Sequence, residues 1–136
     1  MQLPAECGKP GMCAKLLRCL YGTRDAPARW EAHYSTELVK MGFVRGLASP
    51  CCFHHPERDI RAVVHGDDFT FSGEEVHLRW VQEKMQASFL CEVEGMLGPD
   101  PSDLKEVRLL NRVIRWGPRG VRYESDPRHA EMLIRD

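Results

Sequence analysis

The chain has 136 residues, of which 43% are hydrophobic and 29% charged, so it fits one soluble domain or part of one. Its nine prolines and eleven glycines are too few for a collagenous or low-complexity chain. It has no run of about 18 apolar residues, which excludes a membrane span. The first residues have neither the basic nor the apolar segment of a secretory signal, which predicts an intracellular protein of the cytoplasm or nucleus, not a secreted one. The net charge of −1 divides into +3 over residues 1–30, −7 over 31–104 and +3 over 105–136, which fits a cation site between surfaces that meet an anion, or an ordinary solvated surface.

The first predicted element is a helix that follows an extended entry loop over residues 1–14. It is expected to begin near Asp25 or Ala26, because Asp25 suits an N-cap and Pro27 is tolerated in a first turn. Gly42 is expected to end it. One apolar stripe runs along this helix at helical spacing and consists of Trp30, Tyr34, Leu38 and Met41.

Extended chain is predicted next, over residues 43–55, interrupted at Gly46 and Pro50. A β-hairpin follows, with strands over 60–65 and 69–72 and a tight turn over 66–68. The hairpin therefore carries two aspartates, Asp67 and Asp68, at its tip.

A second helix is predicted to begin with a capping box, Ser72 followed by Glu75, and to run to about Phe89. Residues 95–103 form a loop, and strands over 107–116 and 121–124 form a second hairpin. Asp126 is the predicted N-cap of a last helix that runs off the end of the chain. This order predicts an α+β fold in which antiparallel hairpins pack against helices, in a single domain over 1–136, with residues 15–94 and 104–136 as its main parts.

The six cysteines are read as reduced thiols, because none forms a Cys-x-x-Cys pair and no secretory signal precedes them. The run Cys51-Cys52-Phe53-His54-His55 raises a zinc hypothesis. Neighbouring residues of a strand point to opposite faces, however, so a buried strand end is the favoured interpretation. The helical tryptophans Trp30 and Trp80 are expected to fill the core.

The adjacent aspartates Asp67 and Asp68 are the strongest candidate for chemistry. Two like charges held together are costly unless a cation offsets them, and carboxylate oxygens on a rigid turn suit Mg²⁺. Two such ions can stabilise both the attacking and the leaving oxygen of a phosphoryl transfer. The alternative is a pair of solvated turn residues, since Gly-Asp is a common turn dipeptide.

Two stretches of the sequence match known motifs. Val64-His65-Gly66-Asp67-Asp68 resembles the aspartate-pair motif of reverse transcriptases, usually Tyr-x-Asp-Asp. Leu20-Tyr21-Gly22-Thr23-Arg24-Asp25-Ala26-Pro27-Ala28-Arg29-Trp30 resembles the Leu-Tyr-Gly-Leu-Lys-Gln-Ala-Pro-Arg-x-Trp block of the copia-type retrotransposon reverse transcriptases. Four further segments match segments of this family in their sequence pattern or in their position along the chain, namely residues 42–43, 49–53, 107–116 and 128–133.

The resemblance implies part of a polymerase palm, with RNA-directed DNA synthesis as the activity. Asp67 and Asp68 would be catalytic carboxylates that hold two Mg²⁺. The partners implied are an RNA or DNA template-primer, deoxynucleoside triphosphates and the other parts of a Pol polyprotein. The residues that would contact template, primer or nucleotide are Tyr21, Gly22, Arg24, Arg29, His65 and Gly66, with His65 where the family usually has tyrosine.

Departures from the family pattern limit this expectation. The family uses a third carboxylate on a strand well before the Leu-Tyr-Gly block, and Glu6 is the sole acid of residues 1–19. We therefore expect the isolated chain not to polymerise DNA, and expect a palm without that strand to self-associate. Two alternatives stay open: a non-catalytic module that binds nucleic acid or another partner, and a segment of an RNA-templated RNA polymerase, where Gly-Asp-Asp also occurs.

Overall fold

The computed structural model describes residues 15, 17–110, 112–124 and 128–135. It is an α+β protein with two antiparallel sheets, as predicted. Its contacts divide the chain into two compact units, Met1–Cys91 and Glu92–Asp136, and each is described by itself. The predicted entry loop over 1–14 and the predicted cap Asp126 lie outside the described residues.

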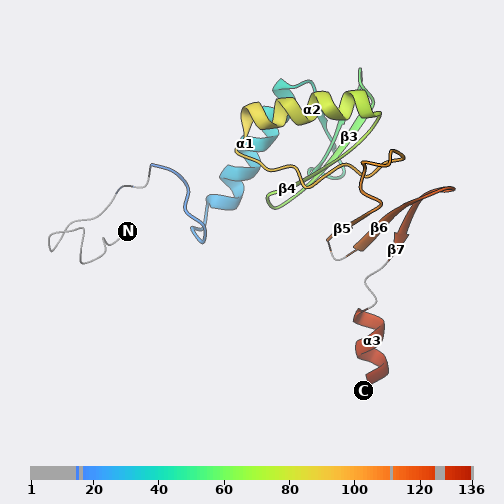
Figure 1. The fold of residues 1–136 in the computed structure, drawn as a ribbon. Helices are drawn as coiled ribbons and strands as arrows, with labels where there is room; N and C mark the ends of the chain where they lie inside the picture. Colours follow the sequence, from blue (N-terminus) through green and yellow to red (C-terminus); the bar gives the residue numbers. More distant parts are fainter. Residues whose placement is uncertain (1–14, 16, 111, 125–127, 136) are drawn as a thin grey trace. The chain divides into compact units, whose positions relative to one another are not determined.

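The first unit is a four-stranded antiparallel sheet with two helices on one side of it (Figure 1). The strands follow one another in chain order, and the elements are α1 (Ala26–Lys40), β1 (Val44–Arg45), β2 (Cys52–His55), β3 (Ile60–His65), β4 (Asp68–Ser72) and α2 (Glu75–Ser88). Alternate residues of β3 are buried, namely Ile60, Ala62 and Val64. The sheet therefore buries one face against the helices and leaves the other open, as period-2 side-chain alternation requires.

Helix α1 confirms the predicted start and stripe. It begins at Ala26 with Pro27 in its first turn, and Tyr34 and Leu38 are buried, the latter completely. Asp25 occupies the N-cap position without making a side-chain cap; its carboxylate instead accepts a hydrogen bond of 2.9 Å from Arg29 Nε. The chain leaves the helix through Gly42, whose φ of +98° is a left-handed conformation that glycine adopts without strain.

The predicted hairpin is present, with a shorter turn than expected. His65 pairs with Asp68, so the turn consists of Gly66 and Asp67, and Asp68 is the first residue of β4. Of the two central residues only Gly66 has a positive φ, +63°. This is the φ pattern of a type II′ turn, which matches the right-handed twist of the flanking strands and closes the hairpin with two residues.

The second helix is confirmed, but its predicted capping box is wrong. Helix α2 has Glu74 at the N-cap position, and Ser72 stays in β4, where it pairs with Arg61. Strand pairing thus holds Ser72 away from the helix that a local pattern assigned to it. Val81 and Met85 are the buried residues of this helix.

The second unit contains a three-stranded antiparallel sheet of β5 (Glu106–Leu109), β6 (Arg112–Gly117) and β7 (Gly120–Glu124), followed by α3 (Arg128–Arg135). The prediction of one strand over 107–116 is wrong, because the chain reverses at Leu110, whose φ is +50°. The β6–β7 hairpin is confirmed, with Gly117 paired to Gly120 around the turn residues Pro118 and Arg119. In the loop before β5, Lys105 Nζ donates to the carbonyls of Gly98, at 2.8 Å, and Asp100, at 2.6 Å.

Among the described residues, none of the helices has both the length and the apolar character that crossing a membrane requires.

Candidate functional site

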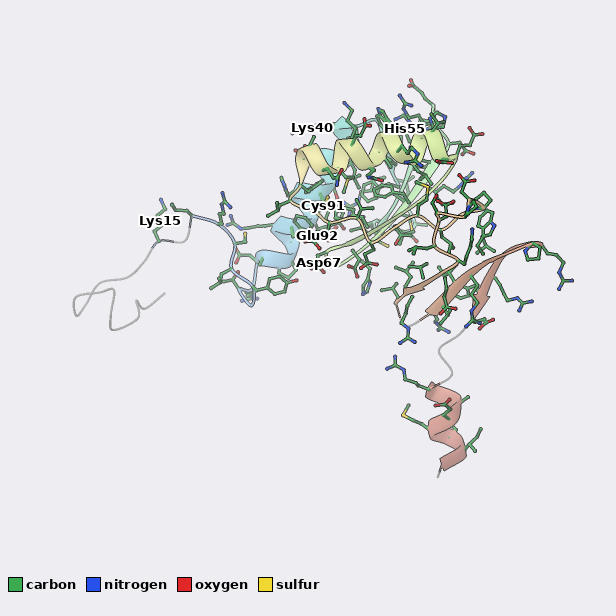
Figure 2. The ribbon with its side chains drawn as sticks, viewed as in Figure 1. Lys15, Lys40, His55, Asp67, Cys91 and Glu92 are labelled. Atoms are coloured by element: carbon green, nitrogen blue, oxygen red, sulfur yellow. The ribbon has the colours of Figure 1, made fainter. Side chains whose placement is uncertain are left out.

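The β3–β4 turn presents the two aspartates at the end of a supported hairpin. Both are exposed. Because Asp68 pairs with His65, and exposed residues of β3 alternate with the buried ones, the side chains of His65 and Asp68 belong to the open face of the sheet. Asp67 occupies the turn itself (Figure 2). The two carboxylates thus start from adjacent backbone positions at the rim of an uncovered sheet face.

The first turns of α1 hold this hairpin end through Trp30. The indole Nε1–H donates a hydrogen bond of 2.7 Å to the carbonyl oxygen of Gly66. The ring also meets Phe69 edge-on, with centroids 6.1 Å apart and an interplanar angle of 81°. Trp30 therefore contacts the residues immediately before and after the aspartate pair. Its expected packing against the core is confirmed, but nothing in the sequence indicated the hydrogen bond, because the two residues are 36 positions apart.

The segment before α1 is exposed. Tyr21 has 91% of its surface accessible, and Gly22 turns the chain with a φ of +86°. Thr23 closes this turn, with its hydroxyl donating to the carbonyl of Leu20 at 2.8 Å. Within the described residues no hydrogen bond or ion pair joins this segment to the aspartates.

The two predicted arginine contacts differ in their surroundings. The guanidinium of Arg29 is engaged by Asp25, whereas Arg24 has no partner among the described residues and is exposed. Of the predicted site residues, the structure brings together His65, Gly66, Asp67 and Asp68. In the part of the chain that the structure describes, no hydrogen bond or ion pair joins Tyr21, Gly22, Arg24 or Arg29 to them.

The aspartate pair offers two carboxylates to a cation. Among the described residues no cluster of three or more histidine, cysteine or acidic side chains has the arrangement of a metal site. A hard cation held by Asp67 and Asp68 would therefore take its remaining ligands from water or phosphate, as Mg²⁺ commonly does.

The run from Cys51 to His55 does not converge on one point. Phe53 and His55 are buried, while His54 lies on the open face and its Nε2 is 3.1 Å from Asp59 Oδ1. This contact and the nearby Arg61 hold the pKa of Asp59 below its usual range. The expected buried strand end is therefore found at Phe53 and His55, while His54 is exposed. His55 packs between Phe43 and Trp80 with ring centroids 5.2 Å and 5.4 Å away.

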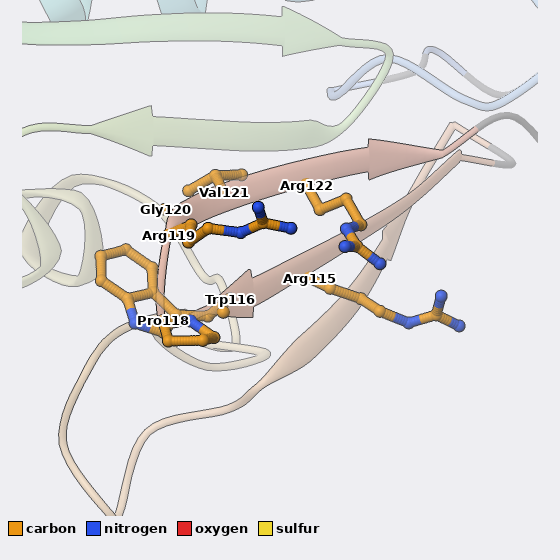
Figure 3. A pocket seen from close by; sticks show the side chains of 8 residues that line it. Arg115, Trp116, Pro118, Arg119, Gly120, Val121 and Arg122 are labelled. Carbon is orange, nitrogen blue, oxygen red and sulfur yellow. The ribbon is translucent and has the colours of Figure 1, made fainter.

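In the second unit, the β6–β7 hairpin lines a cavity of about 400 Å³. Arg115, Arg119, Arg122 and Trp116 contribute to its walls (Figure 3). Arg115 is paired with Glu106 and Glu124, at 2.5 Å each, and these contacts raise its pKa. Arg122 lies directly across from Arg115 in the sheet. Arg119 and Arg122 have no acidic partner among the described residues, so they are the guanidinium groups open to an anion.

Comparison with known proteins leaves the family undecided. No protein-family model matches the chain, and neither the curated proteins nor the solved structures contain a match. The resemblance to reverse transcriptases therefore stays a prediction from the sequence.

Proposed function

We propose that this chain is part of the palm of a copia-like reverse transcriptase, in which Asp67 and Asp68 bind divalent cations for nucleotidyl transfer. One observation carries the proposal. The two segments with the most specific likeness to this family, residues 20–30 and 64–68, meet through the hydrogen bond from Trp30 to Gly66. A likeness carried by two separate stretches of sequence is better supported when those stretches are in contact at the proposed site.

The exposed carboxylates fit a hard cation on chemical grounds, since oxygen ligands on a rigid hairpin suit Mg²⁺ and leave room for phosphate. When bound, such ions would stabilise the negative charge that develops at the α-phosphate as a primer 3′-hydroxyl attacks it. His65, on the same sheet face as Asp68, would stack on the primer end with less area than tyrosine. Arg24 would meet a phosphate of template or nucleotide through its planar guanidinium.

With two carboxylates instead of three, the isolated chain is proposed to bind cations weakly and not to extend a primer. Primer extension by this chain alone with Mg²⁺ would contradict that part of the proposal.

Binding of Mn²⁺ tests the site directly. In the wild-type chain we expect paramagnetic broadening of the amide resonances of residues 65–69. Replacing Asp67 or Asp68 by asparagine should weaken binding about thirtyfold each, because a carboxylate about 4 Å from a divalent ion contributes about 2 kcal/mol in water. The affinity is measured by titrating Mn²⁺ against the broadening.

A matched control separates a site from general surface charge. Glu74→Gln with Glu75→Gln removes the same charge from another adjacent, exposed acidic pair, at the start of α2. This variant should keep the Mn²⁺ affinity of the wild type. Equally weakened binding in this variant and in Asp67→Asn with Asp68→Asn, or broadening that persists without Asp67 and Asp68, would refute the metal site.

The second candidate function is a non-catalytic module that binds nucleic acid, and the β6–β7 hairpin favours it. Arg119 and Arg122 line the cavity without an acidic partner among the described residues, and Trp116 offers an aromatic ring for base stacking. The surrounding segment, residues 105–136, is basic by +3.

This candidate predicts salt-dependent binding of a single-stranded oligonucleotide that survives Asp67→Asn with Asp68→Asn. Arg119→Ala with Arg122→Ala should lower the slope of log affinity against log salt by about 1.4, about 0.7 for each phosphate that an arginine no longer neutralises. Lys40→Ala with Lys84→Ala removes two exposed lysines from the other unit and should leave the slope unchanged. Fluorescence anisotropy at several salt concentrations measures the slope. Equal slopes for the two double variants would exclude the β6–β7 hairpin as the binding site for the oligonucleotide.

A further inference from the structure

The hydrogen bond from Trp30 reaches the peptide group that defines the turn. Gly66 and Asp67 are its central residues, so the carbonyl of Gly66 and the N–H of Asp67 belong to one planar peptide at its centre. Trp30 Nε1 is 2.7 Å from that carbonyl oxygen. A bond to this oxygen therefore orients the whole central peptide.

The orientation of the central peptide sets the backbone conformation of Asp67. Two-residue hairpin turns are of type II′ or type I′, and the two types differ by a flip of that peptide. Here Gly66 has a φ of +63° and Asp67 a negative φ, which is the type II′ pattern. A flip to type I′ would give Asp67 a positive φ as well, a conformation that aspartate tolerates better than most residues. The dipeptide alone thus allows both turns, with opposite directions for the Gly66 carbonyl and the Asp67 N–H.

The packing of Trp30 makes it a rigid donor. Its ring is partly buried and meets Tyr34, Phe69 and Phe89 edge-on, with centroids 5.8, 6.1 and 5.8 Å apart. An indole held by three aromatic neighbours loses little further freedom when it donates, so the bond favours one turn geometry.

We propose that Trp30 is the positioning residue of the aspartate turn: its indole N–H selects the type II′ conformation and so fixes the backbone of Asp67 within the carboxylate pair. The metal-binding consequence rests on the proposed function, whereas the conformational consequence does not. Trp30 acts here through Gly66 and is not itself expected to touch metal or nucleotide.

The experiment compares Trp30→Phe with Trp80→Phe in the metal-free chain. Phenylalanine keeps an aromatic ring in the core but cannot donate. Trp80 is an equally suitable core tryptophan, in contact with His55 and Arg58 rather than with the turn. In the wild type, the backbone coupling constant of Asp67 should report a negative φ. In Trp30→Phe this coupling should move toward an average of two turns, with exchange broadening of the Asp67 amide, while Trp80→Phe retains the wild-type value.

The same variants are then titrated with Mn²⁺. Trp30→Phe should weaken binding about fivefold, the equivalent of one neutral hydrogen bond of about 1 kcal/mol at 1.4 kcal/mol per factor of ten. Trp80→Phe should bind as the wild type does, even if both variants melt at a lower temperature. If Trp30→Phe fails to fold, benzothienylalanine at position 30 keeps the shape of the indole and lacks the N–H.

The outcomes are separable. A wild-type Asp67 coupling in the folded position-30 variant refutes the proposal, as does an equal change in Trp80→Phe. If the wild type binds no Mn²⁺, the proposed metal site fails, and the Asp67 coupling still decides whether Trp30 selects the turn.

Discussion

Leu38→Ala is expected to lower the free energy of unfolding of the first unit by about 3–5 kcal/mol. Leu38 has 0% of its surface exposed and lies on α1 within the core cluster. Truncation removes its buried methyl groups and leaves a cavity that close-packed neighbours fill only partly, which is why such changes cost about 2–5 kcal/mol in general. Urea unfolding followed by circular dichroism measures the destabilisation, and Trp30 fluorescence reports the same transition near the candidate site.

The control for this prediction is Leu47→Ala. Leu47 is fully exposed, so its truncation removes the same atoms without opening a cavity, and its effect should stay within about 0.5 kcal/mol. Similar destabilisation in both variants would mean that the helix does not pack on the sheet as described, and that the support of the Gly66–Asp67 turn by α1 is wrong.

Gly42→Ala is expected to cost about 2–5 kcal/mol, from two separate causes. Gly42 has a φ of +98°, and a side chain in the left-handed region costs about 1–2 kcal/mol. An added Cβ would also stand 2.9 Å from His55 Nε2. The His55 ring is buried between Phe43 and Trp80 and cannot move aside freely, so overpacking adds about 1–3 kcal/mol. Thermal and urea unfolding both measure this effect.

Gly22→Ala isolates the backbone cause. Gly22 has a similar positive φ of +86°, but nothing lies within 4 Å of an added Cβ, so its replacement should cost only the conformational part. Combining Gly42→Ala with His55→Ala should then cost less than the sum of the single changes, because the second change removes the obstacle met by the first. Strict additivity would show that His55 does not contact Gly42 closely.

The elements that could be predicted are those whose cause is local. Helix α1 was predictable because its apolar residues recur at helical spacing. Its end was predictable because helices commonly end at a residue in the left-handed conformation, which Gly42 adopts. The β3–β4 hairpin was predictable from an alternating strand and a Gly-Asp turn. The errors lie where two local patterns compete, as at Ser72, which suits a helix cap but is retained by pairing with Arg61.

In the candidate site, too, only the features with a local cause could be predicted from the sequence. Asp67 and Asp68 could be singled out because adjacent carboxylates at a turn are chemically conspicuous. That His55 would pack between Phe43 and Trp80, and that Trp30 would donate to Gly66, could not be foreseen, because both depend on which distant elements become neighbours. Sequence spacing carries no signal for a contact across 36 positions.

By itself the sequence determined where helices and strands alternate and which two aspartates lie at the end of the hairpin, because periodicity and turn chemistry act within a few residues. Tertiary structure alone decided that Asp68 belongs to a strand, that the residues at 107–116 form two strands, and that α1 supports the turn through Trp30. The physical reason is that hydrogen bonds and packing between distant segments form only once the chain has folded, and they override local preference wherever a backbone group finds a better partner far away.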